Sequence, residues 1–212
     1  MEHYASEQEQ VEALKRWWKD NGRPLVFGLA IGIAALAGYR YWDAMQTARA
    51  EDASQNYSAM LQMMNDQRID DARTTGQAII DTYPDSTYAR LSALLLAKLA
   101  ADTEDYARAR ELLTPLVEGA GDSEVAPLAR ARLARLALAE GNADTAAAYM
   151  AKVPPTADED RFAELRGDIL VAQGKPDAAR PLYLEALALA EKLGLERGAI
   201  QLKLDNLGAS GS

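Results

Sequence analysis

The chain has 212 residues, of which 49% are apolar and 26% charged, and its 32 acidic and 23 basic side chains give a formal net charge of −9. This apolar fraction is sufficient for a hydrophobic core and argues against wholesale disorder. The chain has no cysteine, which excludes disulfides, thiolate nucleophiles, cysteine-ligated metals and a lipidated N-terminal cysteine. The acidic balance argues against a general nucleic-acid binder. Abundant alanine and leucine predict an all-α protein.

Residues 1–23 form a polar N-terminal tail with a short amphipathic stretch. Val11, Leu14 and Trp18 recur at the spacing of one helix face, and charged residues occupy the other side. We expect this stretch to lie on the cytoplasmic surface of a membrane, with a contact to a cytoplasmic partner as the alternative.

Residues 24–42 are predicted to be a single transmembrane anchor. The sixteen residues from Pro24 to Tyr39 carry no charge and span about 24 Å as a helix, somewhat less than a hydrocarbon core of about 30 Å. Aromatic residues on both sides supply the missing length and an interfacial belt. These predicted interfacial anchors are Trp17, Trp18, Tyr41 and Trp42.

Two other interpretations of this segment remain open. A cleavable signal peptide would end at the small residues Ala35-Leu36-Ala37, although the long acidic stretch before the segment is unlike a signal peptide. A buried helix of a soluble core would also be apolar, but sharp charge boundaries and aromatic flanks favour the anchor.

The basic residues around the anchor predict its orientation. Four precede the apolar run, namely Lys15, Arg16, Lys19 and Arg23, and only Arg40 and Arg49 lie in the twenty residues after it. The excess of positive charge predicts a cytoplasmic N-terminus and places the rest of the chain on the other side of the membrane.

Small residues in the anchor predict a packing face for another helix. Gly28 and Gly32 are four residues apart, and Gly38 repeats that spacing with Ala34, so another helix backbone can approach closely. A second copy of this chain is one candidate for that helix. The alternative is that glycine is simply common in membrane helices.

Residues 43–199 show the spacing of stacked helix pairs. Gly141 and Gly174 each separate two helical stretches and lie 33 residues apart, a period typical of α-solenoids. The last unit is similar to the tetratricopeptide repeat pattern of small residue, alanine, aromatic, alanine, in Gly167, Ala179, Tyr183 and Ala186. Earlier units align on Ala72, Ala109 and Ala146, and the first is degenerate, with Met60, Gly76 and Ile79. An ordinary helical bundle is the alternative.

A solenoid of this kind presents the first helix of each pair along one binding surface. The alignment predicts that this groove includes Tyr57, Leu61, Met64, Leu91, Leu94, Lys98, Leu128, Arg135 and Leu138, and in the last unit the charged residues Arg161, Glu164 and Asp168. The alternative is that these residues pack in the core, against a neighbouring helix or against residues 200–212, which form a C-terminal tail or a capping segment.

No catalytic, cofactor or metal site is expected. His3, the single histidine, lies in the N-terminal tail, and no glycine-rich phosphate loop is present. Asp158-Glu159-Asp160 lacks the ligand spacing of a calcium loop and is predicted to be an acidic first turn of a helix.

The whole chain resembles the YfgM family of ancillary SecYEG translocon subunits. The resemblance rests on Trp17-Trp18-Lys19, the anchor from Arg23-Pro24, Tyr57, Tyr83-Pro84, and Gly174-Lys175-Pro176-Asp177-Ala178-Ala179. It implies a bacterial inner-membrane protein with periplasmic repeats that associates with SecYEG and the chaperone PpiD. It also implies transfer of emerging secretory polypeptides to periplasmic chaperones. The alternative function is a structural or signalling envelope subunit that sequesters a regulator or organises another inner-membrane complex.

Overall fold

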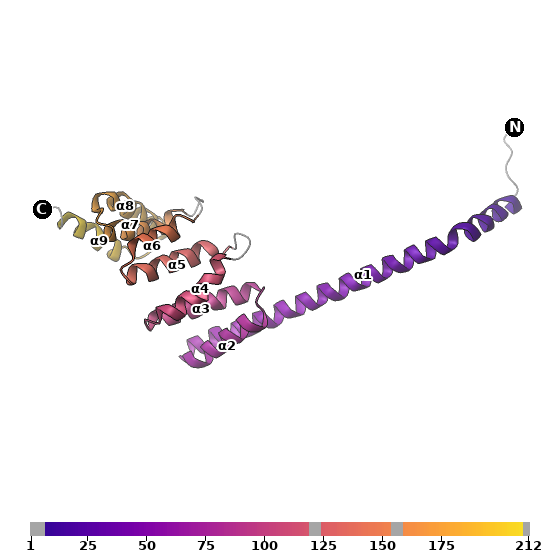
Figure 1. Cartoon of the computed structure of the whole chain (residues 1–212), viewed down its shortest axis with the longest axis horizontal. Coiled ribbons are helices and arrows are strands. Elements are labelled where there is room, and N and C mark those ends of the chain that lie inside the picture. The colour runs from indigo at the N-terminus through magenta and orange to yellow at the C-terminus, as the bar shows by residue number, and fades with distance from the viewer. Residues whose placement is uncertain (1–6, 119–123, 154–158, 210–212) are drawn as a thin grey trace, which may run out of the picture. The chain divides into compact units, whose positions relative to one another are not determined.

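The computed structural model describes residues 7–118, 124–153 and 159–209, and every regular element among them is a helix. The predicted all-α fold is confirmed (Figure 1). The helices are α1 (Glu7–Asn65), α2 (Ile69–Thr82), α3 (Thr87–Asp102), α4 (Tyr106–Glu118), α5 (Ala126–Ala139), α6 (Ala143–Met150), the 3-10 turn η1 (Glu159–Phe162), α7 (Ala163–Ala172), α8 (Pro176–Leu193) and α9 (Gly198–Ala209). The chain divides into two units, residues 1–52 and 53–212, which are described separately.

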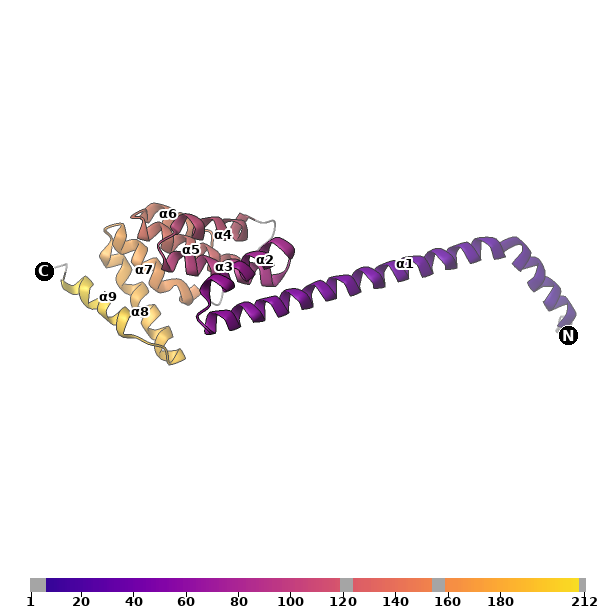
Figure 2. The same cartoon turned by 90° about the horizontal axis from the view of Figure 1, so that it is seen from below.

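The first unit contains most of α1, a helix of 59 residues. Figure 2 shows a bend toward the N-terminal end of this helix, and Pro24 lies inside the helix. Proline removes a backbone donor and disturbs the preceding turn, which is the physical reason for a bend. The helix continues without interruption through residues 24 and 42, where the sequence suggested boundaries.

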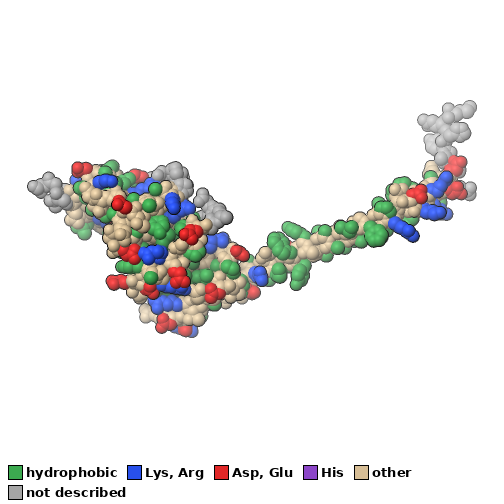
Figure 3. Space-filling model, in the orientation of Figure 1, with side chains coloured by type: hydrophobic (Ala, Val, Ile, Leu, Met, Phe, Trp, Pro, Cys, Tyr) green, Lys and Arg blue, Asp and Glu red, His purple; other side chains and the backbone are tan. Residues whose placement is uncertain are grey.

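The apolar part of α1 is exposed. Among the described residues it is the one helix that is long and apolar enough to cross a membrane, judged by length and composition, and 6% of its apolar window is buried. A core helix of a soluble protein would be mostly buried. Figure 3 shows hydrophobic side chains along this stretch and charged ones near its N-terminal end.

The second unit is a stack of antiparallel helix pairs. Helix α3 pairs with α4, α5 with α6, and α7 with α8, and α9 packs on α8 (Figures 1 and 2). Residues 53–65 of α1 contact α2 through Met60 against Gly76 and Met63 against Thr75. As predicted, Gly141 separates α5 from α6 and Gly174 separates α7 from α8. Each pair contacts its neighbours along the chain, as expected for a repeat architecture.

Three successive hydrophobic clusters make up the core of this stack. The first runs from α1 to α5, the second from α5 to α7, and the third from α7 to α9. Ile200 and Leu204 of α9 are buried in the third cluster. The C-terminal helix therefore covers the apolar end of the stack, which would otherwise face solvent.

Each helix pair carries two buried residues that are 16 positions apart, one on each helix. Met60 meets Gly76 in the first pair and Gly167 meets Tyr183 in the last. The same spacing selects Ala97 with Leu113 and Ala134 with Met150, and we call these four the crossing pairs. A Cβ atom on Gly167 would lie 2.5 Å from Cε1 of Tyr183, and one on Gly76 would lie 2.7 Å from Cε of Met60. The crossings therefore need one small partner, which the first helix supplies in three pairs and the second helix supplies in the first pair.

Each pair also turns at a residue in the left-handed conformation. Gly141 and Gly174 have φ angles of 79° and 73°, and Gln67 and Glu104 adopt 60° and 59° at equivalent places in the first two pairs. A residue in the left-handed conformation just after the last helical turn lets the backbone change direction and so ends the helix. Glycine thus marks only the last two of these turns in the sequence.

Candidate functional site

The first helices of the second and third pairs, α3 and α5, share an exposed stripe. Helix geometry places residues i, i+4, i+7 and i+11 on one side, and the residues of α3 and α5 that follow this spacing are exposed or half-buried. We call these eight residues the first-helix face: Leu91, Leu95, Lys98 and Asp102 of α3, and Leu128, Arg132, Arg135 and Ala139 of α5. The two sets are offset by 37 residues, so they occupy the same repeat positions.

Four of the predicted groove residues belong to this face. Leu91 and Leu128 are half-buried, and Lys98 and Arg135 are exposed. In the first pair, Leu61 is 40% exposed, whereas Tyr57 and Met64 are half-buried and pack at the edge of the first core cluster. Their role in binding a partner stays a prediction.

Leu94 lies elsewhere than expected. Its side chain is only 4% exposed and belongs to the first core cluster, because it lies beside the stripe on the part of α3 that faces neighbouring helices. Leu138 is half-buried and packs against the second core cluster. The predicted groove position of Leu94 is therefore wrong, and the core alternative holds for this residue.

Sequence reasoning missed Leu95 and Arg132 of the first-helix face. Both follow a predicted groove residue by four positions, Leu91 and Leu128 respectively. Adding four positions, about one helix turn, to each of those residues would have identified both, and the offset of 37 residues between α3 and α5 would have shown that they occupy the same repeat position.

The aromatic rings of Tyr57 and Tyr88 join α1 to α3. Their centroids are 5.7 Å apart and their planes are inclined by 43°, a geometry that aromatic pairs favour. Tyr57 is thus fixed by a neighbouring first helix rather than projecting freely.

Arg132 joins α5 to α3 through a polar contact. Its guanidinium donates a hydrogen bond to the backbone carbonyl oxygen of Leu94. Burial, and then the positive charge of Arg135, lower the pKa of Arg132 from its ordinary value. Two guanidinium groups therefore lie close enough on one helix to repel each other.

At α7, a cluster of charged and polar groups replaces the exposed stripe. Lys203 of α9 contacts Glu164 at 2.6 Å and Asp168 at 2.8 Å, and the hydroxyl of Tyr183 donates to Asp168 at 2.8 Å. The ammonium of Lys203 also lies 5.8 Å from the Tyr183 ring centroid. These contacts attach the capping helix to the side of α7 that would otherwise continue the first-helix face.

This cluster changes the acid–base behaviour of its members. Burial, then the hydrogen bond and charge of Asp168 and the charge of Glu164, raise the pKa of Tyr183 well above its ordinary value. Burial alone would lower the pKa of Lys203, but its bonds to Asp168 and Glu164 outweigh burial and raise it. The cluster thus favours a protonated tyrosine and a protonated lysine.

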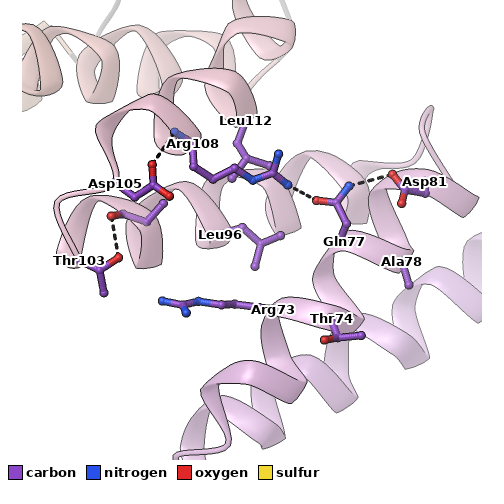
Figure 4. Close-up of a pocket in the computed structure, with 11 residues that line it drawn as sticks. Arg73, Thr74, Gln77, Ala78, Asp81, Leu96, Thr103, Asp105, Arg108 and Leu112 are labelled. Atoms are coloured by element: carbon purple, nitrogen blue, oxygen red, sulfur yellow. Dashed lines mark hydrogen bonds between the residues drawn. The ribbon is translucent and has the colours of Figure 1, made fainter.

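A separate cleft of about 610 Å³ lies between α2, α3 and α4 (Figure 4). Arg108 donates to the amide oxygen of Gln77, whose nitrogen donates to Asp81 at 2.8 Å. Leu96 and Leu112 add apolar lining, and Arg73 extends into the opening (Figure 4). The contacts of Gln77 with Arg108 and Asp81 bridge α2 and α4 across the cleft, so it has the character of a gap between repeats that side chains span.

Within residues 7–118, 124–153 and 159–209, no group of three histidine, cysteine, aspartate or glutamate residues is placed to hold a metal ion. His3 and Asp158 lie outside the described residues, and Glu159 begins η1.

The predicted anchor residues are all exposed in the first unit. Trp17, Trp18, Tyr41 and Trp42 are between 49% and 74% exposed. Apart from adjacent residues and the backbone of α1 itself, no described atom lies within 4 Å of the position that a Cβ of Gly28, Gly32 or Gly38 would occupy. The glycine face is thus open within one chain, and its use as a packing surface stays a prediction.

Comparisons with known proteins agree with this architecture. The model of the tetratricopeptide repeat-like domain family matches residues 15–209. The chain is 28% identical over 207 residues to a protein of Escherichia coli and 26% identical over 208 residues to one of Haemophilus influenzae, covering 98% of this chain and 99% and 100% of the relatives. Both relatives are named "Ancillary SecYEG translocon subunit".

A protein of Neisseria gonorrhoeae with the same name is 28% identical over 213 residues and is also covered along its whole length. The resemblance expected from the sequence is thereby confirmed. No solved structure matches the chain significantly.

Proposed function

Because this chain belongs to the tetratricopeptide repeat-like domain family, and stacked repeats create extended binding surfaces, we propose that it is a membrane-anchored ancillary subunit of the SecYEG translocon. Its first-helix face then binds protein segments near the exit of the channel. The observation that carries this proposal is the end-to-end match with relatives that bear the translocon name.

The arrangement of the chain supports this proposal. One exposed apolar helix precedes a folded repeat domain, so a single chain combines an inner-membrane anchor with a protein-binding module. The excess of basic residues before the apolar run favours a cytoplasmic N-terminus and periplasmic repeats. Periplasmic repeats would meet polypeptides as they emerge.

The finer role that we propose is transfer. The repeats would receive emerging secretory polypeptides and pass them to periplasmic chaperones, with the membrane-anchored chaperone PpiD as a neighbour. A scaffold of this kind needs exposed side chains on a rigid framework, and α3 and α5 supply them. It needs no catalytic group, and we propose that the protein is not an enzyme.

Crosslinking in intact cells tests the proposal. A photoreactive amino acid at Arg135, on the first-helix face, or at Leu61, an exposed residue of α1, is expected to give adducts with SecYEG subunits, PpiD or secretory polypeptides. The matched control is Ala178, an exposed residue of α8, which should give fewer. Consistent adducts with one unrelated envelope protein instead would contradict the proposal and favour a structural or signalling subunit.

The lack of cysteine in the natural chain gives a clean test of topology. Single variants Glu12→Cys and Ala148→Cys place one thiol at an exposed position on each side of the apolar run. A membrane-impermeant maleimide applied to spheroplasts should label Ala148→Cys and should label Glu12→Cys only after lysis. The reverse pattern would overturn the periplasmic assignment.

A further inference from the structure

Helix α5 is a basic element in an acidic domain. Its 14 residues include three arginines and no acidic residue, whereas residues 43–212 as a whole contain 27 acidic and 18 basic side chains. The negatively charged domain therefore repels an acidic segment that approaches it, except where arginines are concentrated.

Two of these arginines lie on the first-helix face. Arg132 and Arg135 are three residues apart, which places them on the same side of α5. Arg132 is half-buried and uses one nitrogen for the carbonyl oxygen of Leu94. Arg135 is exposed and has no ion pair or hydrogen bond to any of the residues that the structure describes. No described carboxylate forms an ion pair with either of these two arginines.

Leucines border the arginine pair. Leu91 and Leu95 of α3 and Leu128 of α5 are half-buried on the same face. Each keeps apolar surface in water that a partner could cover. Lys98 is also on this face, but it is paired with Asp102 at 2.5 Å.

We propose that the first-helix face binds an acidic amphipathic segment of a partner polypeptide, with a carboxylate on Arg132 and Arg135 and apolar side chains on Leu91, Leu95 and Leu128. This inference rests on the proposed function and specifies the chemistry of the segment that is bound.

A carboxylate suits this site for three physical reasons. Guanidinium groups bind carboxylates through two parallel hydrogen bonds. A bound carboxylate removes the repulsion between the two arginines, which already contributes to the lowered pKa of Arg132. The negative surroundings discourage acidic segments elsewhere on the domain, so the attraction is confined to one face.

Fluorescence anisotropy with the full chain in detergent tests the proposal. The probe is a labelled twelve-residue amphipathic peptide of alanine, leucine and glutamate, and its twin has glutamine in place of each glutamate. The glutamate peptide should bind more tightly by about fivefold, the upper range for one exposed ion pair. This preference should shrink as salt is raised, because exposed charges are screened.

Variants locate the effect on the face. Arg135→Gln should remove most of the preference for glutamate, and Leu95→Ser should weaken both peptides. Arg180→Gln, an exposed arginine of α8, is the matched control and should leave both affinities unchanged. Circular dichroism of each variant checks that the helices remain intact.

Several outcomes would overturn the proposal. Equal binding of the two peptides, or equal losses in Arg135→Gln and Arg180→Gln, would show that the arginine pair does not select acidic segments. Tighter binding to vesicles of anionic lipid than to the peptide, with the same dependence on Arg135, would assign the pair to a membrane surface.

Recovery of SecYEG with the tagged full chain separates this inference from the proposed function. If Arg135→Gln still recovers SecYEG but loses the glutamate preference, both proposals stand. If the natural chain recovers no SecYEG, the proposed function fails whatever the peptides do. If it recovers SecYEG but shows no glutamate preference, only the present inference fails.

Discussion

The first and last helix pairs of the repeat domain solve the same packing problem in opposite ways. In the last pair the first helix contributes Gly167 and the second contributes Tyr183, whereas in the first pair the first helix contributes Met60 and the second Gly76. Both crossings bury one large and one minimal side chain. The difference shows that the summed volume of the two residues at the crossing matters more to the fold than which helix carries the larger one.

The two crossings differ in stiffness. Tyr183 is a rigid ring whose hydroxyl is held by Asp168, whereas Met60 ends in a flexible thioether that can change rotamer. The last pair should therefore tolerate less change than the first. The predictions below test this comparison, from the largest expected effect to the smallest.

Exchanging the two residues of the first crossing gives the largest effects. Met60→Gly alone should lower the free energy of unfolding by about 4 kcal/mol, because it leaves a cavity and adds a glycine within a helix. Gly76→Met alone should cost about 3 kcal/mol through overpacking.

The double variant should be more stable than the sum of the two single losses by about 2 kcal/mol, as expected for residues in contact. Urea unfolding of the full chain, followed by circular dichroism, measures all three. Additive losses would show that volume exchange does not explain the first pair.

Adding one methyl group to each glycine compares the two crossings directly. Gly167→Ala should cost about 3 kcal/mol, because the new atom would lie 2.5 Å from the Tyr183 ring. Gly76→Ala should cost about 1 kcal/mol, since the methionine can move away and alanine is the better helix former. Equal losses in urea unfolding would contradict the difference in stiffness.

Removing the hydroxyl of Tyr183 tests what holds the last pair and the capping helix together. Tyr183→Phe should lower the free energy of unfolding by about 1 kcal/mol, the typical worth of one hydrogen bond. Lys203 still pairs with Asp168 and Glu164, so α9 should remain attached. Hydrogen exchange of the α9 amides reports this attachment, and complete loss of protection would contradict it.

The same variant should change the dependence of stability on pH. The pKa of Tyr183 is raised in the folded chain above its ordinary value of 10.0, so its contribution is fully present below pH 10 and is lost as the pH rises beyond it. The free energy of unfolding should therefore fall less steeply above pH 10 in Tyr183→Phe than in the natural chain. The raised pKa of Lys203 acts in the same direction and should leave a residual slope.

The smallest effects concern the turns. Gln67→Gly and Glu104→Gly should each raise the free energy of unfolding by about 0.5 kcal/mol, because glycine adopts a left-handed φ without steric cost but loses more chain entropy on folding. Gly141→Ala should destabilise by about 1 kcal/mol for the converse reason. Thermal unfolding measures both the expected gain of stability in the two glycine variants and the expected loss in Gly141→Ala. A loss of stability in the glycine variants would show that the turn side chains contribute more than their strain costs.

Periodicity and small residues alone were sufficient to predict the repeat architecture. The small residue of each crossing, the glycine turns after α5 and α7 and the apolar stretch of α1 are local signals, so the sequence determined helix type, repeat spacing and the candidate anchor. The first pair appears degenerate in the sequence because its large residue, Met60, lies on the first helix and its small residue, Gly76, on the second. The sequence pattern does not show that the small residue makes room for the large one, since the two meet only when the helices cross.

Tertiary structure decided which side chains remain outside. Leu94 and Leu95 are adjacent and chemically identical, yet one is buried and the other is half-exposed, because a rotation of about 100° per residue separates core from surface. Packing between repeats also attached Lys203 to α7 and left the Arg132 and Arg135 pair without an acidic partner among the described residues. The sequence by itself determined where the helices lie and in what order. Which side chains remain exposed to solvent was decided by the tertiary structure, because it depends on how neighbouring helices cover one another.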